Sequence, residues 1–329
     1  MRFVSYVTVL CCALVASSAV ALDKVTLATH WKAEAEHGGF YQAIADGTYA
    51  EHGLEVQILQ GGPLVNHRLR LAIGRVDFLL GSNLIQAFDA VRADVPTVVI
   101  AGFFQKDVRC LIAHPDSPYE TWSDLKDARL LVSNSGRQTF LRWLVAEHGF
   151  KAENTRPYTF NLAPFLTNPK VVVQGLTTAE PKAIQDALDR EPRVFPLSDH
   201  GWQTYSTTLE THTDLVRDRP EVVQRFVDAS ILGWQAYLEG DPSAAHELIQ
   251  KDNPDMSDSQ LAFSRQRLID DEVVLSGDAN TLGIGALSAD RIQAFYDQMV
   301  EAGLYEPGQV DPEKTYTLQF VNRGTGLKD

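Results

Sequence analysis

Cysteine is scarce in this sequence, and the shortage limits how the fold can be held together. The chain has three cysteines in 329 residues, and Cys11 and Cys12 both lie in an apolar N-terminal segment. If that segment is removed, Cys110 is the single remaining thiol, which excludes an intramolecular disulfide. We therefore predict a fold held together by burial alone, and about 300 residues suffice for that, typically as two lobes.

Long apolar runs are also lacking once the N-terminus is passed. Residues 3–16 form an apolar run behind Arg2 and lead into Ala19-Val20-Ala21, which fits signal peptidase. The run is shorter than the roughly 20 residues of a spanning helix, and no small residues precede Cys11, so an anchor and a lipid site are less favoured. We predict a signal peptide at 1–21, cleaved after Ala21, and a soluble protein in the periplasm.

Basic residues are outnumbered, with 29 Lys and Arg against 43 Asp and Glu, a net charge of −14. Such an acidic chain argues against nucleic acid or an anionic membrane as a partner. We expect a monomer with no nucleic-acid partner.

Familiar catalytic motifs are missing as well. The sequence contains no Gly-x-Gly-x-x-Gly after a strand, no Walker sequence, no Gly-x-Ser-x-Gly and no His-Glu-x-x-His. Cys110 lies in an apolar run and is predicted to be a core residue rather than a nucleophile. No catalytic residue and no cofactor is therefore predicted.

What the sequence does contain is a regular alternation of strands and helices, typical of an α/β fold with parallel strands. In the first part we expect strands at 24–28, 54–59, 76–80 and 97–104 and helices at 38–51, 63–74 and 83–92. After the apolar residues 110–113 we expect strands at 130–133, 158–160 and 175–179 and a helix at 137–147. Two prolines and one glycine, Pro192, Pro196 and Gly201, predict a linker at 192–201, and helices are expected at 220–239, 242–250, 258–270 and 289–302.

This order predicts two lobes with a ligand cleft between them. Residues 22–108 and 203–329 would form lobe 1, and residues 109–202 would form lobe 2. Ligands bind such sheets at the carboxyl ends of the strands and in clefts between lobes.

The loop between the first strand and the first helix is the most unusual stretch. It carries imidazoles, carboxylates and aromatic rings beside a Gly-Gly pair that would let the backbone approach a ligand. The candidate ligand-binding residues here are His30, Trp31, Glu36, His37, Gly38 and Tyr41. His30, Glu36 and His37 are metal-ligand types, but their spacing matches no zinc or iron signature, so no metal site is predicted.

Later strand ends carry further candidates. Three helix starts offer backbone N–H groups to anions or polar ligand edges, although small residues also serve as simple caps. These candidates are Gly62 and Asn66, Ser82 and Asn83, and Asn134, Ser135 and Gly136. Glu180 follows a small-residue strand and could accept N–H groups, while Trp202 and Tyr205 are predicted to complete an aromatic cleft.

Three segments of the sequence match the pattern of a known protein family. They are residues 36–43 (Glu-His-Gly-Gly-Phe-Tyr-Gln-Ala), residues 53–56 and the Gly-Gly-Pro turn at 61–63. The chain resembles periplasmic solute-binding proteins of ABC importers related to fungal thiamine-pyrimidine synthase. The likeness continues through Glu180-Pro181 and residues 225–227. It implies a two-lobed periplasmic-binding-protein fold of type II, a small-molecule ligand and an ABC permease as partner.

The resemblance leaves the ligand open. A planar N-heterocycle, such as a thiamine pyrimidine precursor or a flavin, fits the aromatic rings and the carboxylates Glu36 and Glu180. Arg137, beside Gly136, favours a small anion such as a sulfonate or nitrate instead. The fungal relative is a pyridoxal-phosphate-dependent enzyme, but Gly81 and Ile85 stand where the resemblance implies its lysine and histidine. The enzyme reading is therefore disfavoured.

Overall fold

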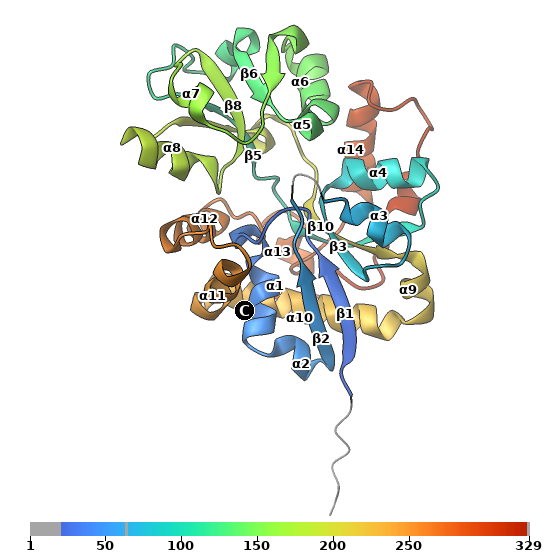
Figure 1. Ribbon diagram of the computed structural model, residues 1–329. Coiled ribbons are helices and arrows are strands. Elements are labelled where there is room, and N and C mark those ends of the chain that lie inside the picture. The colour runs from blue at the N-terminus through green and yellow to red at the C-terminus, as the bar shows by residue number, and fades with distance from the viewer. Residues whose placement is uncertain (1–20, 63–64, 328–329) are drawn as a thin grey trace, which may run out of the picture.

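The computed structural model describes residues 21–62 and 65–327, shown in Figure 1. The predicted signal peptide, apart from Ala21, lies outside the described residues, as do Pro63 and Leu64 of the predicted helix 63–74. Within the described part of the chain, no helix combines the length and the apolarity that crossing a bilayer requires.

The first of two five-stranded sheets is built mainly from the N-terminal third of the chain. Its strands are β1 (Asp23–Ala28), β2 (Leu54–Leu59), β3 (Phe78–Asn83), β4 (Thr97–Phe104) and β10 (Ser206–His212), in the order β2-β1-β3-β10-β4. β1 is parallel to β2 and β3, whereas β10 runs antiparallel between β3 and β4. The predicted strands 54–59 and 97–104 are confirmed, whereas the strand expected at 76–80 begins at Phe78 and ends at Asn83.

The second sheet lies above the first in Figure 1. It contains β5 (Arg109–Ala113), β6 (Arg129–Val132), β7 (Thr155–Pro157), β8 (Val171–Leu176) and β9 (Arg193–Pro196), in the order β7-β6-β8-β5-β9. The prediction of a linker at 192–201 was wrong in part, because β9 pairs with β5 at the edge of this sheet. Proline is tolerated on an edge strand, where its missing N–H interrupts no inner ladder.

Helices cover both sheets and account for most of the last third of the chain. The first part contributes α1 (Gly38–Ala45), α2 (Thr48–Glu51), α3 (His67–Ala72) and α4 (Leu84–Arg92). The second sheet is accompanied by α5 (Asn134–Gln138), α6 (Phe140–His148), α7 (Ala163–Leu166) and α8 (Glu180–Leu188). The C-terminal part adds α9 (Thr213–Asp218), α10 (Pro220–Glu239), α11 (Ser243–Asp252), α12 (Asp258–Asp270), α13 (Ala279–Leu282) and α14 (Ala289–Glu301). Short 3-10 turns are η1 (Ala35–His37), η2 (Trp122–Asp127), η3 (Ala152–Asn154), η4 (Leu197–His200) and η5 (Pro312–Thr315).

Two predicted helices are interrupted for local reasons. The helix expected at 38–51 breaks at Gly47, whose φ of 78° is left-handed and ends the hydrogen-bond ladder. The helix expected at 137–147 breaks at Thr139, whose φ and ψ of −120° and −106° are not helical. Helices 220–239 and 258–270 coincide with α10 and α12.

The Gly-Gly pair at the start of α1 serves helix packing. A Cβ on Gly38 would lie 2.2 Å from the Tyr237 ring, and one on Gly39 would lie 2.3 Å from the Trp234 ring. Both rings belong to α10, so the glycines let α1 press directly against the long helix. Their role is close backbone approach, as predicted, but toward a helix rather than toward a ligand.

The chain crosses between the sheets twice, after β4 and before β10. The two crossings are joined where the indole N–H of Trp202 donates to Asp107 over 3.2 Å, and Asp107 also pairs with Arg109. Both Trp202 and Asp107 are buried. This buried contact fixes where the two crossing segments lie relative to each other.

Candidate functional site

A cavity of about 860 Å³ is lined by residues that follow strands of both sheets. Its size is in the range of pockets that enclose small organic molecules. Ten of the sixteen predicted site residues line it, namely His30, Trp31, Gly62, Asn66, Ser82, Asn83, Asn134, Ser135, Gly136 and Glu180.

Four of the remaining predicted residues lie behind the cavity wall. Glu36 is buried and accepts a hydrogen bond from the hydroxyl of Thr178, which links η1 to the loop before α8. Tyr41 donates to Asp252 of α11 over 2.8 Å, and Gly38 is packed on Tyr237. His37 is fully buried beside His30. These four residues pack behind the residues that line the cavity and do not line it themselves.

Trp202 and Tyr205 lie elsewhere, at the crossing segments. Tyr205 donates its hydroxyl to Asp278, accepts the N–H of Ser288 and packs under the guanidinium of Arg291 at 4.1 Å. With Trp202 held by Asp107, both rings are committed to the protein interior. The sequence could not show this, because a buried aromatic and a cleft aromatic look alike in sequence.

Several polar residues in the cavity wall are helix caps. Asn66 accepts the N–H of Leu69 at 3.1 Å, Asn83 accepts that of Ile85, and Ser133 accepts that of Gly136. These oxygens satisfy helix N–H groups that would otherwise lack partners. Asn134 and Ser135 are the polar side chains of α5 that line the cavity, and the Ser135 hydroxyl lies 3.2 Å from that of Ser133; Arg137 is not among the lining residues.

Two arginines in the wall were missed by the sequence reasoning, and each is paired. Arg68 of α3 donates to both carboxylate oxygens of Glu210 at 2.8 Å, and Arg109 pairs with Asp107 at 2.7 Å. Gly81 makes room for the first pair, since a Cβ there would lie 2.1 Å from Glu210. Both guanidinium charges are thereby compensated within the protein.

Aromatic rings reach the cavity from both sheets. Trp31 follows β1 and Phe160 follows β7, and their ring centroids are 4.8 Å apart at a tilt of 47°. Phe160 keeps 48% of its surface exposed and has a φ of 62°, unusual for a bulky residue. The strand predicted at 158–160 lies earlier in the chain, as β7, and this leaves Phe160 free to face Trp31.

Two carboxyl groups in the wall have raised pKa values. Burial raises the pKa of Glu180 to about 7, and nearby Glu36 adds to the effect, while the N–H of Leu176, donating over 2.8 Å, opposes it. Burial, together with the neighbouring Glu36 and Glu180, raises the pKa of Glu34 well above its ordinary range. A protonated carboxyl group can donate as well as accept a hydrogen bond.

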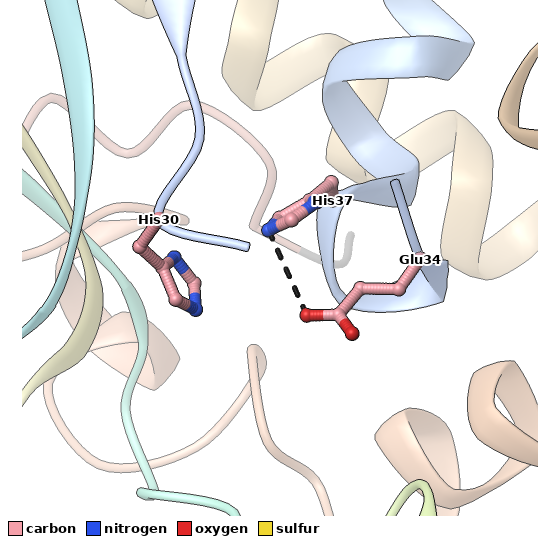
Figure 2. Close-up of side chains that lie close together, drawn as sticks. All are labelled: His30, Glu34 and His37. Atoms are coloured by element: carbon pink, nitrogen blue, oxygen red, sulfur yellow. Dashed lines mark ion pairs between the residues drawn. The ribbon is translucent and has the colours of Figure 1, made fainter. Parts of the chain in front are cut away.

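His30, Glu34 and His37 form a compact cluster, shown in Figure 2, with one potential ligand atom from each within 4.8 Å of the others. His37 Nε2 lies 3.8 Å from Glu34 Oε1. Burial lowers the pKa of His30 to about 4 and that of His37 well below its usual range, so both imidazoles are neutral near pH 7. Glu34 completes the group, whereas Glu36, the carboxylate that the sequence groups with the two histidines, is held by Thr178.

A profile of the NMT1/THI5-like family matches residues 34–245, which is more than half of the chain. The chain belongs to the NMT1/THI5-like family. Among curated proteins no significant match is found. The family span contains α1, the part of the cavity wall from Glu34 onward and all of the second sheet, whereas His30 and Trp31 of the wall lie just before it.

Solved structures with similar folds cover nearly the whole of this NMT1/THI5-like chain. The periplasmic aliphatic sulphonate-binding protein SsuA from Escherichia coli has a TM-score of 0.64 at 14% identity, covering 93% of this chain and 94% of that one. The alkanesulfonate-binding SsuA from Xanthomonas axonopodis pv. citri, bound to MOPS, has 0.64 at 13%, covering 91% and 99%. The desulfurization enzyme DszB has 0.55 at 16%, covering 89% and 97%. These likenesses confirm the predicted α/β periplasmic-binding-protein fold.

Proposed function

We propose that this protein is the periplasmic solute-binding component of an ABC importer. Residues 22–108 with 203–329 would form one lobe and 109–202 the other, closing on a small solute and delivering it to a membrane permease as a monomer. The observation that carries the proposal is the cavity of about 860 Å³, walled by both sheets, in a periplasmic-binding-protein fold.

The solute that the wall favours best is a planar N-heterocycle of the thiamine-precursor or flavin type. Trp31 and Phe160 offer ring faces, and Glu34 and Glu180 offer carboxyl groups to ring nitrogens and amino groups. Arg68 and Arg109 are already paired with carboxylates, which weakens their attraction for an anion.

A sulfonate is the second candidate, and two observations favour it. Asn134 and Ser135 lie in the cavity wall at the start of α5, where helix N–H groups suit an anion. The SsuA structures from E. coli and X. axonopodis share the fold and are sulfonate-binding proteins. A sulfonate would need the carboxyl groups of Glu34 and Glu180 to be protonated, which their raised pKa values favour.

An enzymatic role is less well supported, although DszB shares the fold. A lysine at position 81, where pyridoxal phosphate would need one, would collide with Glu210 inside the first sheet. Burial also raises the pKa of Cys110 well above its usual range, which disfavours a thiolate nucleophile.

Thermal unfolding with a panel of aminopyrimidines, flavins, purines, sulfonates and nitrate tests the proposal. A ligand at 100 times its Kd stabilises the folded state by about 2.7 kcal/mol, which a melt resolves. We expect the heterocycles to raise the Tm. A shift with sulfonates alone would replace the heterocycle by the second candidate, and no shift with any small solute would contradict the binding role.

A further inference from the structure

The strongest unexplained feature of the cavity wall is the histidine pair beside Glu34. His37 is fully buried, yet neither of its ring nitrogens has a hydrogen-bond partner among the described residues, and Nδ1 of His30 also lacks one. A buried polar atom left without a partner costs about 1 to 3 kcal/mol. Three such atoms on two neighbouring imidazole rings indicate a partner that the described residues do not supply, and one ion would take one nitrogen from each ring.

We propose that His30, Glu34 and His37 bind a divalent transition-metal ion of the Zn²⁺ type in the cavity wall. Two imidazoles and one carboxylate are a ligand set that such ions accept while keeping a further coordination position open. Figure 2 shows the three side chains converging on one space from the end of β1 and from the turn before α1.

The geometry is close to what an ion needs. Ligand atoms about 2.1 Å from a tetrahedral zinc lie about 3.4 Å from one another. Here the three lie within 4.8 Å of one another, and His37 Nε2 is 3.8 Å from Glu34 Oε1. Small side-chain rotations close this difference, and the Glu34 carboxyl group gives up its proton to the incoming ion, as metal ligands generally do.

The surrounding fold holds the ligands in place. His37 is anchored because the next residue, Gly38, is packed on the Tyr237 ring. His30 and Glu34 line the cavity, whereas His37 lies behind them. The open position therefore faces the cavity, where a donor atom of the solute would complete the coordination. Coordination of the ion by the solute rests on the proposed function, but binding of the metal ion itself does not.

Titration of the metal-stripped protein with Co²⁺, followed by competition with Zn²⁺, tests the site without any solute. We expect one ion per chain, with the absorption bands of low-coordinate Co²⁺. Glu34→Gln, which preserves shape and removes charge, and His30→Gln should each weaken binding at least about tenfold. The matched control is His52→Gln, since His52 lies outside the cavity lining with its Nδ1 beside the Thr48 carbonyl, and it should bind as the wild type does.

Circular dichroism and thermal unfolding establish that each variant is folded. If His30→Gln fails to fold, the metal affinity of Glu34→Gln alone tests the site. Equal affinity in the wild type and Glu34→Gln, or an equal loss in His52→Gln, would overturn the site. Imidazole added to the Co²⁺-loaded protein should shift the bands, because the open position is accessible from the cavity; unchanged bands would overturn that position. Because no solute is added, a failure here leaves the importer proposal standing, and failure of the solute panel leaves the metal result standing.

Discussion

Glu180 and Glu36 illustrate how environment separates two carboxyl groups of the same type. Glu36 is turned into the protein and held by the Thr178 hydroxyl, whereas Glu180 lines the cavity at the start of α8. Burial raises the pKa of both. Near neutral pH, Glu180 is therefore the cavity carboxyl group poised between donor and acceptor forms.

At this scale we predict a pH-dependent stability that Glu180→Gln removes. A folded pKa of about 7 lies above the unfolded value near 4.5, so the folded state binds more protons between the two values. The stabilising contribution is complete below pH 4.5 and is lost as the pH rises through 7, by up to about 3 kcal/mol. Denaturant unfolding of wild type and Glu180→Gln from pH 5 to 8 measures it, and a constant difference between the two proteins would contradict it.

Among the elements, the segments that cross between the sheets bear most directly on function. Trp202 precedes β10 and binds Asp107, which precedes β5, so one hydrogen bond connects both crossings. Trp31, by contrast, lies in the cavity wall against Phe160. The sequence predicts that both tryptophans line one aromatic cleft, but Trp202 connects the two crossing segments and Trp31 lines the cavity.

We predict that Trp202→Phe destabilises the protein without weakening solute binding. The change removes the hydrogen bond to a buried carboxylate and part of a buried ring, a loss of about 2 kcal/mol or more. Trp31→Ala is the matched variant, and it should lower solute affinity at least about tenfold with a smaller effect on stability. Calorimetry with the solute found in the panel, alongside denaturant unfolding, measures both quantities. A loss of affinity in Trp202→Phe with unchanged stability would return Trp202 to the binding site.

For the whole molecule, the cavity wall depends on contacts between the two sheets and the C-terminal helices. Thr178, just before α8, donates to Glu36, and its carbonyl accepts from Ser264 of α12 at 2.6 Å. Such a contact stabilises one arrangement of the two parts. A solute bridging the cavity would shift the population further toward that arrangement.

We predict that solute draws the two parts together, as read by energy transfer between dyes. The dyes are attached at Glu55→Cys on β2, beside the first sheet, and at Glu153→Cys on η3, beside the second sheet, and both positions are exposed. The native Cys110 is buried and therefore does not react with the dyes. Solute should raise the transfer efficiency of this pair. A control pair, Glu55→Cys with Arg92→Cys of α4, lies on one side only and should not respond. Equal responses of both pairs would contradict closure.

Local pattern alone determined the alternation of strands and helices, the exact course of 54–59, 97–104, 220–239 and 258–270, and the ten candidates that line the cavity. The carboxyl ends of parallel strands meet at one edge of a sheet, so the order of the strands along the chain suffices to predict which residues line a cavity there. β10 escaped prediction because Ser206–His212 has a single large apolar residue, Leu209, and its buried threonines give no apolar alternation.

Only the tertiary structure decided which side chains meet. Glu34 and Glu36 are two residues apart, but Glu34 has an extended backbone before η1 and Glu36 lies within that turn, so they point to different partners. Spacing rules for metal ligands describe regular helices and hairpins and miss a cluster assembled across a loop. The pairing of Arg68 with Glu210, 142 positions later, likewise depended on long-range packing that no local pattern records.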